Sequence, residues 1–550
     1  MTTRAPELTP PQTPATPRVP TAWRWAMGAL AVALLFYVYW RLSWSGAANS
    51  DSAAIAIQAR EILHGNWLLR GWWMADVTFY TTEVPQYALL EAVGGFGVWV
   101  VHVAAAMSYT LIVVLAALLA KGRATGSEGW TRALLGGGIA ASPQVSGALI
   151  MLLGPDHTGT VVPVLATWLV IDRAGPGGRP PGSPRDRGQP SPRTPLAPVI
   201  VCLLLTWIMV ADQVVLLTAI GPLIAAAVVR AFRRHEGRRY ELALAAAAAV
   251  AAGLGVVIPN LITRLGGYKV WHFQTHTMPL SKLPRDAWHT VEAVLELFGA
   301  NVFEPHSPVE AVLVAIHLAG VLAAIAALGI AVARFFREDA ILVPGLAVGI
   351  ALEIGAFLVT IHSSNLASIR EIVAVMPLGA VLAGRLLAAP LLRLARASLS
   401  RARTVAVAAV AAVVLAGYLG SMAYDAARAS VPSANQELAT WLAGHGLTGG
   451  LAAYWQAGSI TLDTGGKVTV NSVVVTRQHK LGVYYWESDR AQYNPAMHSA
   501  TFVVAGGPAV DVPMPGMERA AIRTFGPPAH TYRVGAYTVL VWQTNILRHL

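Results

Sequence analysis

Eleven long apolar runs, separated by short polar segments, dominate this sequence. A membrane-spanning helix needs about 20 predominantly apolar residues. Of the 550 residues, 55% are hydrophobic and only 13% are charged, whereas a soluble domain carries about 25% charged residues. The sequence therefore predicts a mainly α-helical, polytopic membrane protein with about eleven transmembrane helices. The runs cover residues 23–42, 98–120, 133–153, 158–172, 196–211, 213–232, 240–262, 308–333, 341–361, 372–392 and 404–423.

The positive charges are placed between the apolar runs rather than on one basic face. A net charge of +11 could suit nucleic acid, but this distribution is typical of residues that orient membrane helices. Arginine and lysine gather in alternate connecting segments, chiefly 121–132, 173–195, 230–239 and 393–403. These segments are expected on the cytoplasmic side, together with the N-terminus. We therefore expect a multi-pass protein of the inner or plasma membrane, with an extracytoplasmic C-terminus and no nucleic-acid partner.

Three regions follow from this pattern. Residues 1–22 are rich in Pro and Thr and are expected to form a disordered cytoplasmic tail. Residues 23–424 form the transmembrane domain, with a long first outer loop at 43–97. After residue 424 the apolar runs stop, and residues 425–550 are expected to form a small extracytoplasmic α/β domain. Its expected elements are a helix at 433–443, strands at 468–475 and 500–504, and a hairpin over 532–542 that turns at Gly535-Ala536.

The stretch 49–65, directly after the first apolar run, is polar at its start and helical in pattern. Asp51 near its beginning is a carboxylate just outside the membrane. It could act as a general base that takes the proton from an acceptor hydroxyl as that oxygen attacks a sugar carbon. Alternatively Ser50, Asp51 or Ser52 could simply cap the helix.

Further acidic and imidazole groups lie on the predicted outer side. Asp156 and His157 follow a proline at the mouth of a span, where they could bind metal or phosphate or form a capping turn. Asp212 separates two apolar runs and so lies near membrane depth, where an ionisable side chain is costly unless it is paired or functional. Glu83 in the first outer loop is a further candidate for substrate binding.

Two basic residues are candidates for binding the phosphate of a lipid. Arg370 stands at the outer end of a late span, shortly before Met376-Pro377, and its guanidinium could bind phosphate bidentately. The alternatives are an interfacial arginine or an ion pair with the adjacent Glu371. Lys269, in the fourth outer segment, could provide a second phosphate contact.

The layout of the chain resembles that of the GT-C superfamily of membrane glycosyltransferases, which includes protein mannosyltransferases and the aminoarabinose lipid A transferase. The matching features are an acidic residue that begins the first-loop helix (49–52), a second outer-loop acidic residue (155–157) and an arginine before a proline on a late span (369–377). The C-terminal α/β domain also matches. Residues 154–160 are moreover similar to uncharacterised actinobacterial membrane proteins. By this resemblance, Asp51 corresponds to the catalytic carboxylate and Arg370 to a donor-phosphate contact.

The resemblance implies an inverting transfer of a sugar from a polyprenyl-phosphate donor to a glycan, lipid or protein of the cell envelope. Asp51 is the expected catalytic residue. Asp156, His157, Asp212, Arg370, Lys269 and Glu83 are the expected substrate-binding residues. A divalent metal, if one is used, would be held by Asp51, Asp156 and His157. The competing interpretations are a transporter or flippase of a lipid-linked glycan and a non-catalytic envelope scaffold.

Overall fold

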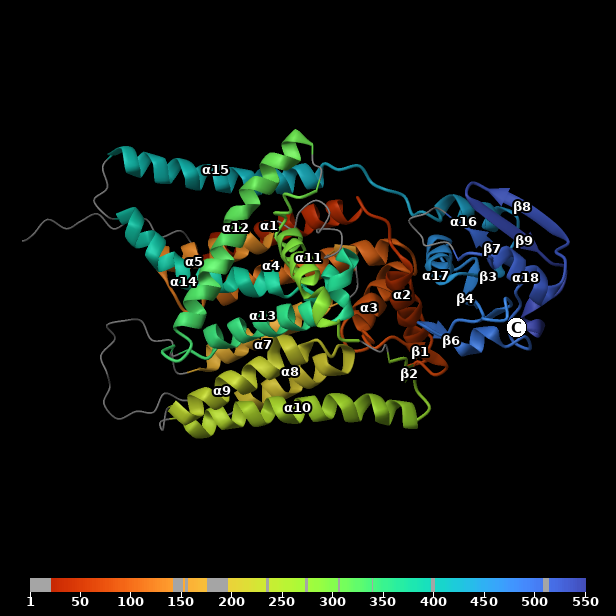
Figure 1. Ribbon diagram of the computed structural model, residues 1–550, viewed down its shortest axis with the longest axis horizontal. Coiled ribbons are helices and arrows are strands. Elements are labelled where there is room, and N and C mark those ends of the chain that lie inside the picture. Colours follow the sequence, from red (N-terminus) through yellow and green to blue (C-terminus); the bar gives the residue numbers. More distant parts are fainter. Residues whose placement is uncertain are drawn as a thin grey trace, which may run out of the picture.

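The computed structural model describes residues 21–141, 152–153, 157–175, 196–233, 237–272, 276–304, 307–338, 340–396, 401–507 and 514–550. Every predicted apolar run contains an α-helix, and these helices lie together in a bundle in which most run along the long dimension of the molecule while α12 crosses it obliquely (Figure 1). They are α1 (Thr21–Ser43), α4 (Trp99–Lys121), α5 (Gly126–Ala141), α7 (Thr158–Ala174), α8 (Ala197–Ala211), α9 (Gly221–Arg233), α10 (Arg238–Arg264), α12 (Pro308–Ala333), α13 (Leu342–Val359), α14 (Val375–Arg396) and α15 (Arg401–Ala426).

Eight helical segments of the described residues are long and apolar enough to cross a membrane. The helices α5, α7 and α8 are shorter, with 16, 17 and 15 residues. The outward faces of the bundle carry large apolar side chains such as Leu203, Val257 and Leu322, each more than half exposed. Hydrocarbon chains of lipid, rather than water, are the solvent that suits such faces. The predicted membrane protein is confirmed, and the count of eleven spans stays a prediction.

One end of the bundle is covered by short elements that belong to the predicted outer loops. The first loop forms α2 (Ser50–Leu63), β1 (Trp72–Met74) and α3 (Glu83–Gly94). Later loops add β2 (Lys269–Val270), α11 (Leu283–Leu297), and the 3-10 turns η2 (Leu280–Lys282), η3 (Ile361–Ser364) and η4 (Leu366–Ile372). The short π-helix η1 (Leu216–Ile220) leads directly into α9. In Figure 1, α2 and α3 lie between the bundle and the C-terminal sheet.

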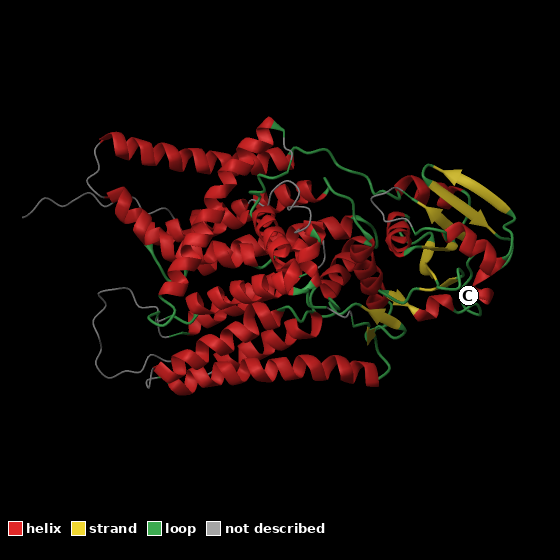
Figure 2. Ribbon diagram, in the orientation of Figure 1, coloured by secondary structure: helices red, strands yellow, loops and turns green. Residues whose placement is uncertain are grey.

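The C-terminal segment contains a six-stranded sheet with helices on both faces. Its strand order is β5-β4-β3-β7-β9-β8, in which β3 pairs in parallel with β4 and β7. Figure 2 shows these strands gathered at the end of the molecule opposite most of the bundle. The elements are α16 (Gln436–Gly444), β3 (Gly449–Ala452), α17 (Tyr454–Asp463), β4 (Thr469–Val475), β5 (Leu481–Val483), β6 (Ser488–Asp489), η5 (Arg490–Tyr493), β7 (Phe502–Gly506), α18 (Met517–Phe525), β8 (His530–Val534), β9 (Tyr537–Val541) and η7 (Ile546–His549).

The alternation of side chains along β7 explains why helices cover both faces of this sheet. Phe502 and Val504 point into the cluster that α16 and α17 cover, whereas Val503 and Ala505 point into the cluster that α18 covers. Successive residues of a strand face opposite sides, so a strand with an apolar residue at every position needs two apolar layers. The predicted hairpin is present, with Val534 opposite Tyr537.

A second, three-stranded sheet joins three distant parts of the chain. Its order is β2-β1-β6, with β1 parallel to β2 and antiparallel to β6. Because β1 lies in the first outer loop, β2 in the fourth and β6 in the C-terminal segment, this sheet ties all three together. The helix α17 of the C-terminal segment also packs against the first-loop helix α2.

Candidate active site

The helix α2 begins with a cap that leaves the Asp51 carboxylate free for other contacts. Asn49 is the N-cap: its Oδ1 accepts the backbone N–H of Ser52 at 3.0 Å, and the Ser52 hydroxyl accepts the N–H of Asn49 at 3.2 Å. The expectation that residue 50, 51 or 52 is the cap is therefore wrong. The polar run contains two good cap residues next to each other, and Asn49 is the one with extended backbone.

The Asp51 carboxylate contacts two side chains from distant parts of the chain. The Tyr454 hydroxyl, at the start of α17, donates to Oδ1 at 2.6 Å, and Nη1 of Arg370, on η4, lies 3.6 Å from Oδ2. The side chain of Asp51 is 13% exposed and that of Arg370 is 36% exposed. Burial raises the pKa of Asp51, and the contacts with Tyr454 and Arg370 offset part of that rise. A carboxylate with a raised pKa is a stronger proton acceptor once it is ionised.

A buried imidazole, that of His157, is linked to this carboxylate–guanidinium pair through Glu371, the residue that follows Arg370. The Nδ1 atom of His157 is 2.7 Å from Oδ2 of Asp212, and its Nε2 atom is 2.9 Å from Oε2 of Glu371. Although burial lowers the pKa of His157, the two carboxylates raise it well above its ordinary value. His157 is thus an imidazolium that donates to both carboxylates. Glu371 directly follows Arg370 in the chain, and Arg370 is the partner of Asp51. The contacts of His157 therefore reach the neighbour of that arginine.

Backbone geometry shows how the chain brings His157 into this position. His157 has φ of +48°, in the left-handed region that non-glycine residues seldom adopt. Asp212 ends α8, and its carboxylate also accepts the Thr160 hydroxyl at 2.6 Å and the Val214 N–H at 2.9 Å. The Asp212 side chain is only 1% exposed. Its three contacts, with His157, Thr160 and Val214, satisfy both oxygens of this buried carboxylate.

Glu83 lies beside this group, at the start of α3. Its carboxyl accepts the Thr82 hydroxyl, and burial raises the pKa of Glu83 to about 8. It is therefore mostly neutral near pH 7. A Cβ atom at Gly159 would clash with Oε1 of Glu83. Gly159 therefore lets the start of α7 approach the Glu83 side chain.

The structure brings four of the seven predicted site residues together, namely Asp51 with Arg370 and His157 with Asp212, and places Glu83 beside them. Lys269 lies on β2 with Nζ 5.2 Å from the centre of the Trp73 ring, a cation–π contact rather than a contact with Asp51. Asp156 lies outside the described residues. Among the described residues, no group of three or more His, Cys, Asp or Glu is arranged to hold a metal ion.

Sequence reasoning missed several members of this site. Tyr454 was not predicted, because a tyrosine 403 residues from Asp51 gives no local signal of contact. Glu371 was considered only as a partner of Arg370. Glu353, on α13, is 2% exposed and interacts electrostatically with His157 and Asp212. A carboxylate within an apolar run is the signal that could have found Glu353.

Comparisons with known proteins agree with this architecture. No family model and no curated protein matches the sequence. Among solved structures, ArnT from Cupriavidus metallidurans bound to undecaprenyl phosphate has a TM-score of 0.53 at 12% identity, covering 94% of this chain and 98% of that one. Its apo form has a TM-score of 0.51 at 14% identity, covering 95% and 98%. The fold is of the GT-C type.

A third structure, the oligosaccharyltransferase AglB from Archaeoglobus fulgidus in complex with an inhibitory peptide and a dolichol-phosphate, has a TM-score of 0.49 at 12% identity. It covers 88% of this chain and 70% of that one. The predicted fold class, a helical GT-C-type membrane protein with a C-terminal sheet, is confirmed by the ArnT likeness. The similarity to actinobacterial membrane proteins stays a prediction.

Proposed function

We propose that this protein is a membrane glycosyltransferase that transfers a sugar from a polyprenyl-phosphate donor to an acceptor hydroxyl at the extracytoplasmic surface of the inner or plasma membrane. The fold supports this proposal, since a protein of the same fold, ArnT, is bound to undecaprenyl phosphate. The orientation that goes with it has the N-terminus in the cytoplasm and residues 425–550 as an extracytoplasmic domain. The acceptor belongs to the cell envelope and is a glycan, a lipid or a protein.

The observation that carries the proposal is the pairing of Asp51 with Arg370. A carboxylate and a guanidinium face each other where the first outer helix meets the outer end of a late membrane helix. The carboxylate can accept a proton, and the guanidinium can bind a phosphate oxygen. Because η4 leads directly into the apolar α14, a phosphate at Arg370 can keep its lipid tail in the bilayer.

The reaction then balances as a direct displacement. The acceptor oxygen forms a new bond to the anomeric carbon of the donor sugar while its proton passes to the Asp51 carboxylate. The bond between the anomeric carbon and the phosphate oxygen breaks, and its electron pair leaves with the polyprenyl phosphate. Arg370 stabilises the negative charge that develops on that phosphate. Attack from the opposite face inverts the anomeric configuration, as the GT-C resemblance implies.

His157, Asp212 and Glu371 serve as a positioning group in this scheme. His157 fixes Glu371 to the end of α8, and η4 carries both Glu371 and Arg370. Rotation of η4 would move the guanidinium away from Asp51, and the imidazolium bridge opposes that rotation. Such support raises the rate through geometry rather than through contact with substrate.

The decisive experiment measures transfer of radiolabelled sugar from polyprenyl-phosphate-sugars to membrane acceptors by the purified protein in liposomes. Asp51→Asn should lower the transfer rate by about 10²–10⁴-fold, the usual contribution of a general base. Glu518→Gln, at an exposed carboxylate of α18, is the matched control and should keep full activity. Full transfer by Asp51→Asn would contradict the assignment of the base. Movement of the labelled lipid between leaflets without transfer would support a flippase instead.

A further inference from the structure

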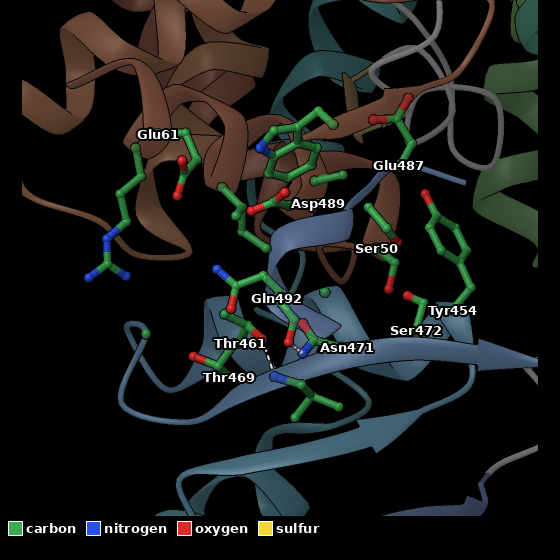
Figure 3. Close-up of a pocket in the computed structure, with 18 of the residues that line it drawn as sticks. Ser50, Glu61, Tyr454, Thr461, Thr469, Asn471, Ser472, Glu487, Asp489 and Gln492 are labelled. Carbon is green, nitrogen blue, oxygen red and sulfur yellow. Dashed lines mark hydrogen bonds between the residues drawn. The ribbon is translucent and has the colours of Figure 1, made fainter. Parts of the chain in front are cut away.

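A cavity of about 400 Å³ lies between α2 and the C-terminal segment. One wall consists of α2 and β1 residues, including Ser50, Glu61 and Trp72, and the other consists of C-terminal residues around β4 and η5, including Asn471 and Gln492. Figure 3 shows the labelled side chains of both walls converging on the same space. Its volume lies within the range of about 300–1,000 Å³ that small-molecule sites occupy.

Two buried donors in the first wall have no hydrogen-bond partner among the residues that the structure describes. Ser50 and Trp72 both line the cavity and are only 1% and 3% exposed, and the unpaired donors are the Ser50 hydroxyl and the Trp72 indole N–H. In Figure 3 the Ser50 side chain points toward the C-terminal wall. Buried polar groups in native proteins are almost always paired. Two such groups on one cavity wall therefore indicate a ligand that supplies hydrogen-bond acceptors there.

The chemistry of the lining favours a polyhydroxylated, uncharged ligand. Hydroxyls and amides surround the cavity, and the carboxylates of Glu61, Glu487 and Asp489 outnumber the single arginine, Arg60. The excess of negative charge disfavours a phosphate or a uronic acid. Carboxylates and side-chain amides accept hydrogen bonds from sugar hydroxyls, while Ser50 and the Trp72 N–H donate to sugar oxygens.

The cavity adjoins the proposed catalytic carboxylate on the side away from the phosphate contact. Tyr454 lines the cavity and also donates to Oδ1 of Asp51, whereas Arg370 faces Oδ2. A ligand in the cavity thus lies one side chain away from Asp51, on the side of the C-terminal segment. The donor lipid phosphate would approach from the opposite, membrane side.

We infer that this cavity binds the uncharged saccharide end of the acceptor. The role of the ligand as acceptor rests on the proposed function. Its identity as a saccharide rests on the lining of the cavity itself. It assigns the α2-to-sheet junction as the acceptor subsite and predicts a glycan, or a glycosylated lipid or protein, as the acceptor class. Asn471 and Gln492 are then specificity-determining residues that contact the sugar without taking part in the chemistry.

The test is a binding measurement that needs no donor lipid. Full-length protein in nanodiscs is titrated with methyl α-mannopyranoside, methyl α-arabinofuranoside, mannobiose and glucuronic acid, and binding is followed by saturation-transfer NMR. At least one neutral sugar should bind, and Asn471→Ala or Gln492→Ala should weaken that binding about tenfold, as expected for the loss of one hydrogen bond. Gln478→Ala, an exposed glutamine of the same segment, is the matched control and should bind like the parent protein.

The outcomes separate this inference from the proposed function. Sugar binding that depends on Asn471 and Gln492 supports the subsite even where no donor yields transfer. Where transfer occurs, the same two substitutions should raise KM for the acceptor while kcat stays within about twofold. Absence of binding by every neutral sugar, preferential binding of glucuronic acid, or equal binding by the Gln492→Ala and Gln478→Ala variants would each overturn the inference. Thermal unfolding midpoints equal to that of the parent protein verify that the variants are folded.

Discussion

At the scale of single residues, the environment of Asp51 is a balance between burial and two polar contacts. Burial raises the pKa of its carboxyl, and the Tyr454 hydrogen bond and Arg370 lower it. A base must be ionised to work, so the balance sets the lower end of the pH range in which the proposed transfer can run. Tyr454 belongs to the C-terminal segment, so that segment tunes a group on the first outer helix.

Tyr454→Phe should therefore move the acid limb of the pH–rate profile to higher pH. The hydrogen bond from the tyrosine hydroxyl stabilises the ionised carboxylate of Asp51 more than its neutral form. Its removal therefore raises the pKa of Asp51 further. Activity at the alkaline plateau should persist, since the carboxylate remains. The measurement is kcat/KM for sugar transfer across pH, with Tyr532→Phe, at an exposed tyrosine of β8, as a matched tyrosine control. An acid limb at an unchanged or lower pH would show that Tyr454 does not act on the base.

Gly159 leaves room for the buried Glu83 carboxyl because it has no side chain. Gly159→Ala would place a methyl group against the buried Glu83 carboxyl, and overpacking of this kind costs about 1–3 kcal/mol. We expect a lower thermal unfolding midpoint and a weaker transfer activity. The double variant Glu83→Ala/Gly159→Ala should recover most of the lost stability, because it removes the clashing carboxyl. Equal midpoints for the single variant and the parent protein would contradict this packing argument.

At the scale of elements, the His157 imidazolium joins the start of α7, the end of α8 and η4. The pKa of His157 is raised in the folded protein, and its unfolded value is about 6.5. The stabilisation from this bridge is therefore fully present below about pH 6.5 and is lost as pH rises through the higher folded value. Deprotonation would leave two carboxylates facing a neutral ring.

We expect the unfolding midpoint to fall as pH rises through the alkaline range, and this fall should be absent from His157→Asn. The variant should also be less stable than the parent at pH 6, because removing one partner of a buried pair costs about 3–5 kcal/mol. Scanning calorimetry of the protein in detergent across pH gives both results. His64→Asn, at an exposed histidine of the first loop, is the control. A pH dependence that is identical in the His157 variant would show that another group carries it.

The long helices were predictable from the sequence, and the three-stranded sheet was not. Apolar runs of about 20 residues carry a local signal for each membrane helix, and the hairpin at Gly535-Ala536 has a local turn signal. The strands β1, β2 and β6 have only two or three residues each. Their pairing is decided by segments hundreds of positions apart, which no local pattern records. Asp51, His157 and Arg370 could be proposed as site residues by residue type, while Tyr454 required that long-range pairing.

At the scale of the whole molecule, the C-terminal segment is an integral part of the proposed site. It contacts α2 through α17, pairs with β1 through β6 and supplies Tyr454 to Asp51. Glu487 strengthens this junction: Oε1 accepts the N–H of Ala75 at 2.6 Å and Oε2 accepts the Gln58 side-chain amide. Glu487 has φ of +48°, so the junction also holds a backbone conformation that an isolated segment would seldom adopt.

Glu487→Ala should loosen this junction and lower the transfer rate, in addition to any contact that the carboxylate makes with a ligand in the cavity it lines. The buried amide of Gln58 and the N–H of Ala75 would lose their acceptor, at a cost of about 1–3 kcal/mol for each group left unsatisfied. The expected result is a lower unfolding midpoint together with faster proteolysis between residues 426 and 436, and a fall in kcat as Tyr454 becomes less well positioned. Glu487→Gln keeps one acceptor oxygen and should recover part of both losses. Parent values of kcat and of the midpoint in Glu487→Ala would contradict this argument. The C-terminal segment would then be held by the β1–β6 pairing and the α2–α17 contact alone, and its coupling to Asp51 would not depend on this carboxylate.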